Sequence, residues 1–131
     1  MAILLLIIIN NVDGYSLNVD RWSAMHYALK AWLKGEYAYS ATDHLNGRTS
    51  NFPGLLLIGL PFYLIGNVAL LQVFSFLLLS YTLIKTTKVK EAFSFLFLLL
   101  LSPAYWWEIF AFSDLLSNII IIFCTICCRK Y

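Results

Sequence analysis

The feature that most constrains this chain is an uncharged apolar run from Phe52 to Ile84. As one straight helix the run would measure about 48 Å, whereas the hydrocarbon core of a bilayer is roughly 30 Å thick. Gly59, Pro61 and the pair Gly66-Asn67 provide places where a helix can break. Two arrangements remain open: two full membrane spans, or a short interfacial helix followed by one span.

The distribution of basic residues favours the second arrangement. The connector 85–90 carries a cluster of lysines, and Arg129-Lys130 stand at the C-terminus. By the positive-inside rule, both segments are expected to be cytoplasmic. A short helix over Pro53–Ile65 near the outer interface and a span over Val68–Ile84 then place the polar loop 10–51 outside.

Composition sets the broad class. The chain is 61% hydrophobic and 12% charged, which is too few charges to cover the surface of a soluble domain. Ala92–Pro103 and Leu115–Cys128 are expected to be further spans, and Ala2–Ile9 the outer end of a first, truncated span. A signal-peptide core is the less suitable interpretation of Ala2–Ile9, because no basic residue precedes it. The sequence predicts an all-α integral membrane protein with about four transmembrane helices, the first of them truncated.

The polar loop 10–51 contains one segment with a helical pattern, Asp20–Lys34. Asp20 can cap its N-terminus and Gly35 can close its C-terminus. The pattern predicts an amphipathic, juxtamembrane helix at the membrane interface. Its apolar face is expected to carry Trp22, Met25, Leu29, Trp32 and Leu33. Positions 10–14 are turn-like, and positions 36–50 show no clear period.

Several short motifs follow one another in this part of the chain. They are Asp20 with Trp22 and Ala24, then Gly35-Glu36-Tyr37, Leu45-Asn46-Gly47 and Phe52-Pro53-Gly54-Leu55. In order and approximate spacing, the segment resembles the first outer loop of the C-type, polyprenyl-phosphate-sugar-dependent membrane glycosyltransferases. That family includes the protein O-mannosyltransferases and the bacterial lipid A aminoarabinose transferases. Downstream, Ser102-Pro103 and the segment 112–116 resemble the family's Ser-Pro and the Asp at the head of its next span.

Two positions depart from the family pattern. Arg21 follows Asp20 where many members have Glu, and Asn51 stands near a position that is often Glu or His. The resemblance implies an inverting transferase that moves a sugar from a polyprenyl-phosphate donor to a lipid, glycan or protein acceptor at the outer face. The membrane it implies is the inner membrane of a bacterium. Family enzymes have more spans, so residues 1–131 are expected to be the N-terminal part of one membrane domain. The alternatives are a small non-enzymatic membrane scaffold and an inactive gene remnant.

Sugar transfer needs a base for the acceptor proton, and positive charge or a divalent metal for the leaving phosphate. The resemblance implies that Asp20 is the base. Asp114 is a second catalytic candidate, because acidic groups at the rim of a span are commonly functional. For either residue the alternative role is that of a helix N-cap. No metal ligand can be assigned, and a divalent metal remains possible.

Weaker candidates for substrate binding lie around these two acids. They are Arg48, His44, Glu108 and Asn51. Arg48 can bind a phosphate, although an arginine in an exposed loop is more often simply solvated. There is no basic stripe of the kind that binds nucleic acid.

All cysteines of the chain lie near its C-terminus, within one helical stretch. They are Cys124, Cys127 and Cys128. This placement does not build a disulfide framework, and three thiols fall short of a zinc site. We expect the cysteines to pack or face lipid, with S-palmitoylation as a minor alternative.

Overall fold

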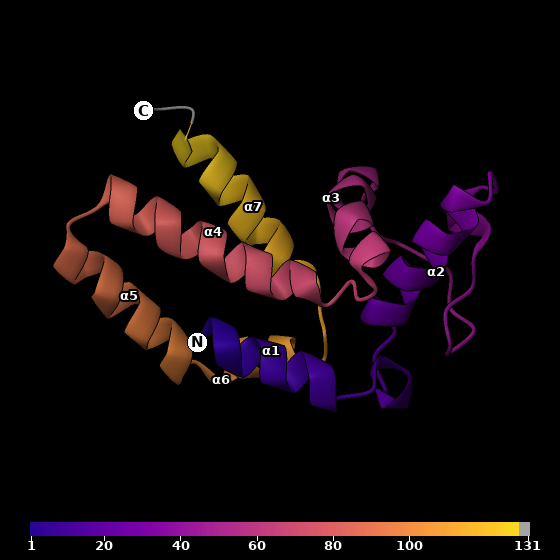
Figure 1. Ribbon diagram of the computed structural model, residues 1–131, viewed down its shortest axis with the longest axis horizontal. Coiled ribbons are helices and arrows are strands. Elements are labelled where there is room, and N and C mark those ends of the chain that lie inside the picture. The colour runs from indigo at the N-terminus through magenta and orange to yellow at the C-terminus, as the bar shows by residue number, and fades with distance from the viewer. Residues whose placement is uncertain (129–131) are drawn as a thin grey trace.

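The computed structural model describes residues 1–128, in which every regular element is a helix (Figure 1). The α-helices are α1 (Ala2–Asn11), α2 (Arg21–Leu33), α3 (Pro53–Ile65), α4 (Leu70–Thr86), α5 (Val89–Leu101), α6 (Pro103–Phe110) and α7 (Leu115–Cys128). Two 3₁₀ turns, η1 (Gly14–Ser16) and η2 (Ala38–Ser40), lie in the polar loop. An isolated antiparallel bridge joins Thr42 to Arg48. The all-α prediction is confirmed, and Arg129-Lys130 lie outside the described residues.

The long apolar run breaks where the sequence predicts. The chain bends by 116° between α3 and α4. Gly66 has a φ of 114°, and the N–H groups of Gly66 and Asn67 donate to the carbonyls of Tyr63 and Phe62. These two bonds form a Schellman motif, which ends a helix on a left-handed residue that is usually glycine. The single long helix is therefore excluded, and Pro61 lies inside α3 without ending it.

A second break separates α5 from α6 at Ser102, next to the residue at which the predicted segment Ala92–Pro103 ends. The chain bends by 66° between the two helices. The Ser102 hydroxyl accepts a hydrogen bond from the N–H of Tyr105 at 3.4 Å, and Pro103 occupies the first turn of α6. Serine at the cap and proline in the first turn are ordinary helix-start signals. The stretch 103–108 was predicted only as an aromatic interface belt, and it is a helix.

Among residues 1–128, no single helix combines the length and the apolar composition needed to cross a bilayer. The pairs α3–α4 and α5–α6 meet both requirements only as bent pairs. α4 is the longest helix, with 17 residues, or about 26 Å at 1.5 Å per residue. The prediction of about four transmembrane helices therefore stays a prediction, because the structure confirms the helices and not their place in a membrane.

The helices bury their apolar side chains in three clusters. The first joins α1, α4 and α6 around Leu5, Phe76 and Ile109. The second holds α2 against α3, and the third joins α4 to α7. Cys124 is buried in the third cluster. α2 and α3 therefore form one end of the molecule, and the connector between α4 and α5 lies at the other (Figure 1).

The buried face of α2 agrees in part with the predicted apolar face, because Met25 and Leu29 are buried. Trp32 and Leu33 are 42% and 52% exposed, whereas Ala24, Ala28 and Ala31 are buried. Because alanine side chains are small, the backbone of α2 can approach the neighbouring elements closely. The predicted C-terminal stop is confirmed: Gly35 has a φ of 80° and follows the last residues of the helix. Asn10 and Asn11, predicted to lie in a turn, are instead the last residues of α1.

Candidate functional site

The turn between α6 and α7 carries a strained residue. Phe112 has a φ of 48°, and its N–H donates to the Ile109 carbonyl while that of Ser113 donates to the Glu108 carbonyl. This is a Schellman arrangement with phenylalanine at the position that favours glycine, at a cost of about 1–2 kcal/mol. The ring is 5% exposed and packs in the first apolar cluster, which offsets the strain. The turn places Asp114 at the head of α7.

A buried hydrogen bond ties Asp114 to the end of the polar loop. The Asn51 Nδ2 donates to the Asp114 Oδ2 at 2.7 Å across 63 positions of sequence. Asn51 is 5% and Asp114 8% exposed. The Asn51 carbonyl also accepts a hydrogen bond from the Tyr39 hydroxyl at 2.9 Å, and the Thr49 hydroxyl donates to the Ala24 carbonyl at 3.1 Å. The loop is thereby fixed to both α2 and α7.

Gln72 of α4 braces the same turn from the other side. Its Nε2 donates to the carbonyls of Glu108 and Ser113 at 2.9 and 3.2 Å. Both partners are acceptors, so the amide orientation is fixed, and the buried Oε1 has no partner among the described residues. Gln72 was not among the site residues predicted from the sequence. Its only signal was a polar amide within an apolar run.

Two small cavities meet at Gln72. One, of about 20 Å³, is bordered by Arg21, Asp114 and Ser117 among others. The second, of about 10 Å³, is bordered by Glu108 and again by Gln72 and Ser117. A space of this size holds about one water molecule. The arrangement provides a polar junction between α2, α4, α6 and α7 in which charged groups lie next to carbonyl and hydroxyl groups.

Asp20 lies at the start of α2 but does not cap it through its side chain. Its carboxylate is 42% exposed and stands 4.0 Å from the Arg21 Nε. An exposed pair of this kind contributes little to stability. Arg21 borders the cavity that Asp114 lines, and Asp20 does not. The two predicted catalytic acids are thus separated by Arg21 and do not share a described cavity.

His44 is held by protein atoms at both ring nitrogens. Its Nε2 donates to the Leu17 carbonyl at 2.8 Å, since a carbonyl can only accept. Its Nδ1 is hydrogen-bonded to the hydroxyl of Ser23, which is fully buried in the first turn of α2. His44 therefore anchors the loop to the helix that begins after Asp20. Its predicted contact with substrate stays a prediction.

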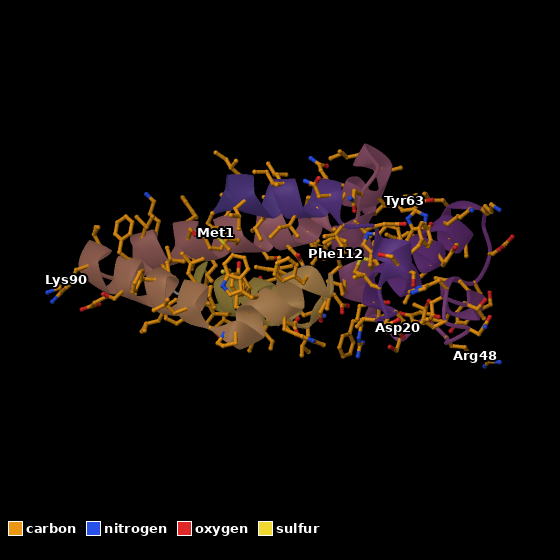
Figure 2. The ribbon with its side chains drawn as sticks, turned by 90° about the horizontal axis from the view of Figure 1, so that it is seen from below. Met1, Asp20, Arg48, Tyr63, Lys90 and Phe112 are labelled. Atoms are coloured by element: carbon orange, nitrogen blue, oxygen red, sulfur yellow. The ribbon has the colours of Figure 1, made fainter. Side chains whose placement is uncertain are left out.

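Arg48 and Glu108 differ in burial and in their distance from the junction at Asp114. Arg48 is exposed and lies towards the end of the molecule, while Asp20 lies between Arg48 and Phe112 along the long axis (Figure 2). Glu108 is half-buried, and its Oε2 accepts from the N–H of Leu116 at 3.4 Å. The structure brings Asp114, Asn51 and Glu108 to one junction and leaves Arg48 away from it.

An aromatic cluster covers another side of α2. The rings of Trp22 and His26 stack at 5.2 Å, and the Trp22 Nε1 donates to the Asn67 Oδ1 at 3.1 Å. This bond connects α2 to the sharp turn between α3 and α4. Burial lowers the pKa of His26, and the nearby Lys30 ammonium lowers it further. Burial and the neighbouring Tyr27 raise the pKa of Tyr15, whose ring meets Trp22 edge-on.

Within residues 1–128 no three His, Cys, Asp or Glu side chains are grouped so that they could hold a metal ion. Scans against protein-family models and searches of curated proteins and solved structures find no match to this chain.

Proposed function

We propose that the chain is part of a membrane-embedded, inverting glycosyltransferase that takes its sugar from a polyprenyl-phosphate donor. The observation that carries the proposal is the buried hydrogen bond between Asn51 and Asp114. This bond joins the end of the loop 10–51, which carries the first set of motifs, to Asp114 in the downstream motif. The two motifs were identified separately in the sequence, and the structure brings them into contact. Strained residues cluster at functional sites, and Phe112, two residues before Asp114, adds support.

The proposed chemistry uses the groups around α2. Asp20, exposed at the helix start, takes the proton of the acceptor hydroxyl, whose oxygen attacks the anomeric carbon from the face opposite the leaving group. The bond from that carbon to the phosphate oxygen breaks, and polyprenyl phosphate departs with the bonding electrons. Arg21, which stands beside Asp20 and borders the cavity lined by Asp114, stabilises the charge of the leaving phosphate.

The membrane location is supported by exposed apolar surface. α5 buries only Ala92 among its residues. Its exposed large side chains are Val89, Phe93, Phe95, Phe97, Leu98 and Leu101, and α1, α4 and α7 also expose apolar side chains. Surfaces of this kind mark contact with lipid or with other protein. We propose that α4, α5 and α7 lie in the bilayer and that the polar loop 10–51 lies outside.

Replacement of Asp20 by Asn tests the catalytic role. Asn keeps the size of the side chain and removes its charge and basicity, so we expect transfer from a polyprenyl-phosphate sugar to fall by on the order of 10²-fold or more. The matched control is Asp13→Asn, because Asp13 is also exposed and its side chain accepts only from the N–H of Tyr15 at the start of η1. Near-normal turnover by the Asp20 variant would remove the catalytic assignment.

A further inference from the structure

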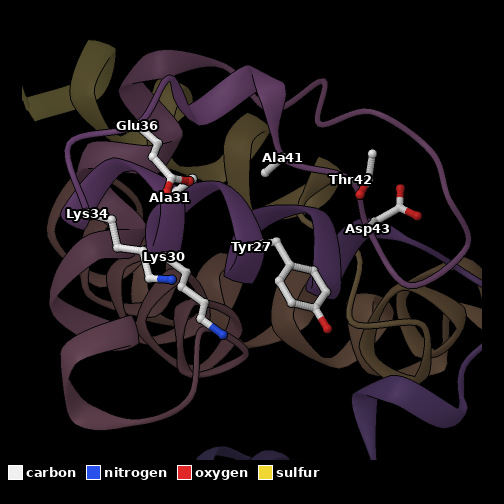
Figure 3. Close-up of a pocket in the computed structure, with 8 residues that line it drawn as sticks. All are labelled: Tyr27, Lys30, Ala31, Lys34, Glu36, Ala41, Thr42 and Asp43. Carbon is white, nitrogen blue, oxygen red and sulfur yellow. The ribbon is translucent and has the colours of Figure 1, made fainter.

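A cleft of about 410 Å³ lies between the C-terminal half of α2 and the loop 36–43 (Figure 3). Its polar lining consists of Tyr27, Lys30, Lys34, Glu36, Thr42 and Asp43. The two lysines project on one side of the cleft with Glu36 near them, and Asp43 lies on the other side. A volume of this size is in the range of small-molecule sites.

The cleft is separate from the junction at Asp114. A helix turns by about 100° per residue, so positions 27, 30, 31 and 34 share one face of α2. The residues of α2 that border the Asp114 cavity, at positions 21, 22 and 25, fall on the opposite face. The two sites therefore share no lining residue, and the inference below stands independently of the reaction proposed above.

Neither lysine of the cleft forms an ion pair with a carboxylate of residues 1–128. In the part of the chain that the structure describes, the only lysine or arginine within 4.0 Å of a carboxylate is Arg21, beside Asp20. The Lys30 Nζ instead lies 6.0 Å from the centre of the Tyr27 ring. Two like charges one turn apart on a helix repel each other, which leaves the site favourable for an anion.

The carboxylate of Asp43 is occupied by its own loop. Its Oδ1 accepts the N–H groups of Leu45 and Gly47 at 2.7 and 2.9 Å. Its buried Oδ2 has no partner among the described residues and faces the Cα of Gly47, where an added Cβ would come within 2.5 Å of it. Asp43 keeps its negative charge in these hydrogen bonds, so the two lysines and the two carboxylates of the cleft balance. Positive charge exceeds negative charge only on the side of the cleft that holds the lysines, because Asp43 lies on the other side (Figure 3).

We propose that this cleft binds a phosphate group through the ammonium groups of Lys30 and Lys34, with the Tyr27 hydroxyl as a further donor. An ammonium group donates every N–H, and charge-assisted hydrogen bonds to phosphate are among the stronger polar contacts in proteins. Glu36 opposes the anion, so Glu36→Gln strengthens binding. The phosphate belongs either to a free anion or to the headgroup of a bilayer lipid.

Binding to the purified full chain in detergent tests the proposal, with inorganic phosphate in one arm and a short-chain phosphatidylglycerol in the other. We expect the double variant Lys30→Gln/Lys34→Gln to weaken binding by about tenfold or more. The matched control, Lys88→Gln/Lys90→Gln, removes the same charge at the opposite end of the molecule, where Lys90 is seen in Figure 2, and is expected to bind like the wild type.

Saturable binding of inorganic phosphate identifies a free anion, and binding of the lipid alone identifies a headgroup; either result requires the loss in the Lys30/Lys34 variant. The proposal is overturned if neither probe binds. It is also overturned if the two double variants lose equal affinity, because the effect would then reflect total charge rather than the cleft. Weaker binding by Glu36→Gln would contradict the placement of Glu36 as an opposing charge.

Discussion

At the residue scale, the pairing of Asn51 with Asp114 is the contact on which the candidate site depends. Removing either partner leaves the other buried and without its hydrogen bond, so each single substitution to Ala is expected to destabilise the fold. In a double-mutant cycle of Asn51→Ala and Asp114→Ala, we expect a coupling of about 1.5–3 kcal/mol, measured by reversible unfolding in detergent. A coupling near zero would mean that the two side chains do not interact.

His26 makes a prediction about pH at the same scale. Its pKa is lowered in the folded protein, chiefly by burial, so the unfolded chain takes up the proton first as the pH falls. Stability from the neutral ring is full above about pH 6.5, the ordinary pKa of His, and is lost progressively as the pH falls from that value through the lower pKa of the folded state. We expect His26→Gln to show a smaller loss of stability than the wild type between about pH 7 and pH 5. Equal losses in the two proteins would contradict this assignment.

At the element scale, the bend between α3 and α4 depends on the left-handed backbone at Gly66. An added Cβ meets no atom within 4 Å at either Gly66 or Gly54, but only Gly66 has a positive φ. We expect Gly66→Ala to lower the free energy of unfolding by about 1–2 kcal/mol. Gly54→Ala, inside α3, should be neutral or stabilising by about 0.5–1 kcal/mol. Equal effects of the two substitutions on denaturant midpoints would show that backbone conformation at Gly66 does not matter.

Elements were predictable where the sequence carries local signals. Gly66-Asn67 marked the end of α3, Gly35 marked the end of α2, and α7 begins at the predicted Leu115. α6 was missed because its aromatic residues suggested a membrane interface, although Ser102 before Pro103 is a helix-start signal. The turn at Phe112 was not predictable, since a buried phenylalanine adopts positive φ only when tertiary packing holds it there.

At the scale of the whole molecule, the candidate site depends on contacts between distant segments, which a sequence pattern does not reveal. The acids at positions 20 and 114 were selected from their places at helix starts and from the family resemblance. That Asn51 would donate to Asp114, and that Gln72 would brace the turn beside it, depends on contacts between elements far apart in the chain. The helix bounds, by contrast, followed from local pattern, since α3 and α7 have the predicted bounds Pro53–Ile65 and Leu115–Cys128.

Membrane orientation is the property of the whole molecule that tests the central claim most directly. Ser40, in the polar loop, and Thr87, in the lysine-rich connector, are both exposed. The measurement is labelling with a membrane-impermeant maleimide in cells, using single Ser40→Cys and Thr87→Cys variants in which Cys124, Cys127 and Cys128 are replaced by Ser. The account predicts that position 40 reacts in intact cells and that position 87 reacts only after permeabilisation. Reaction of both positions from outside would contradict it.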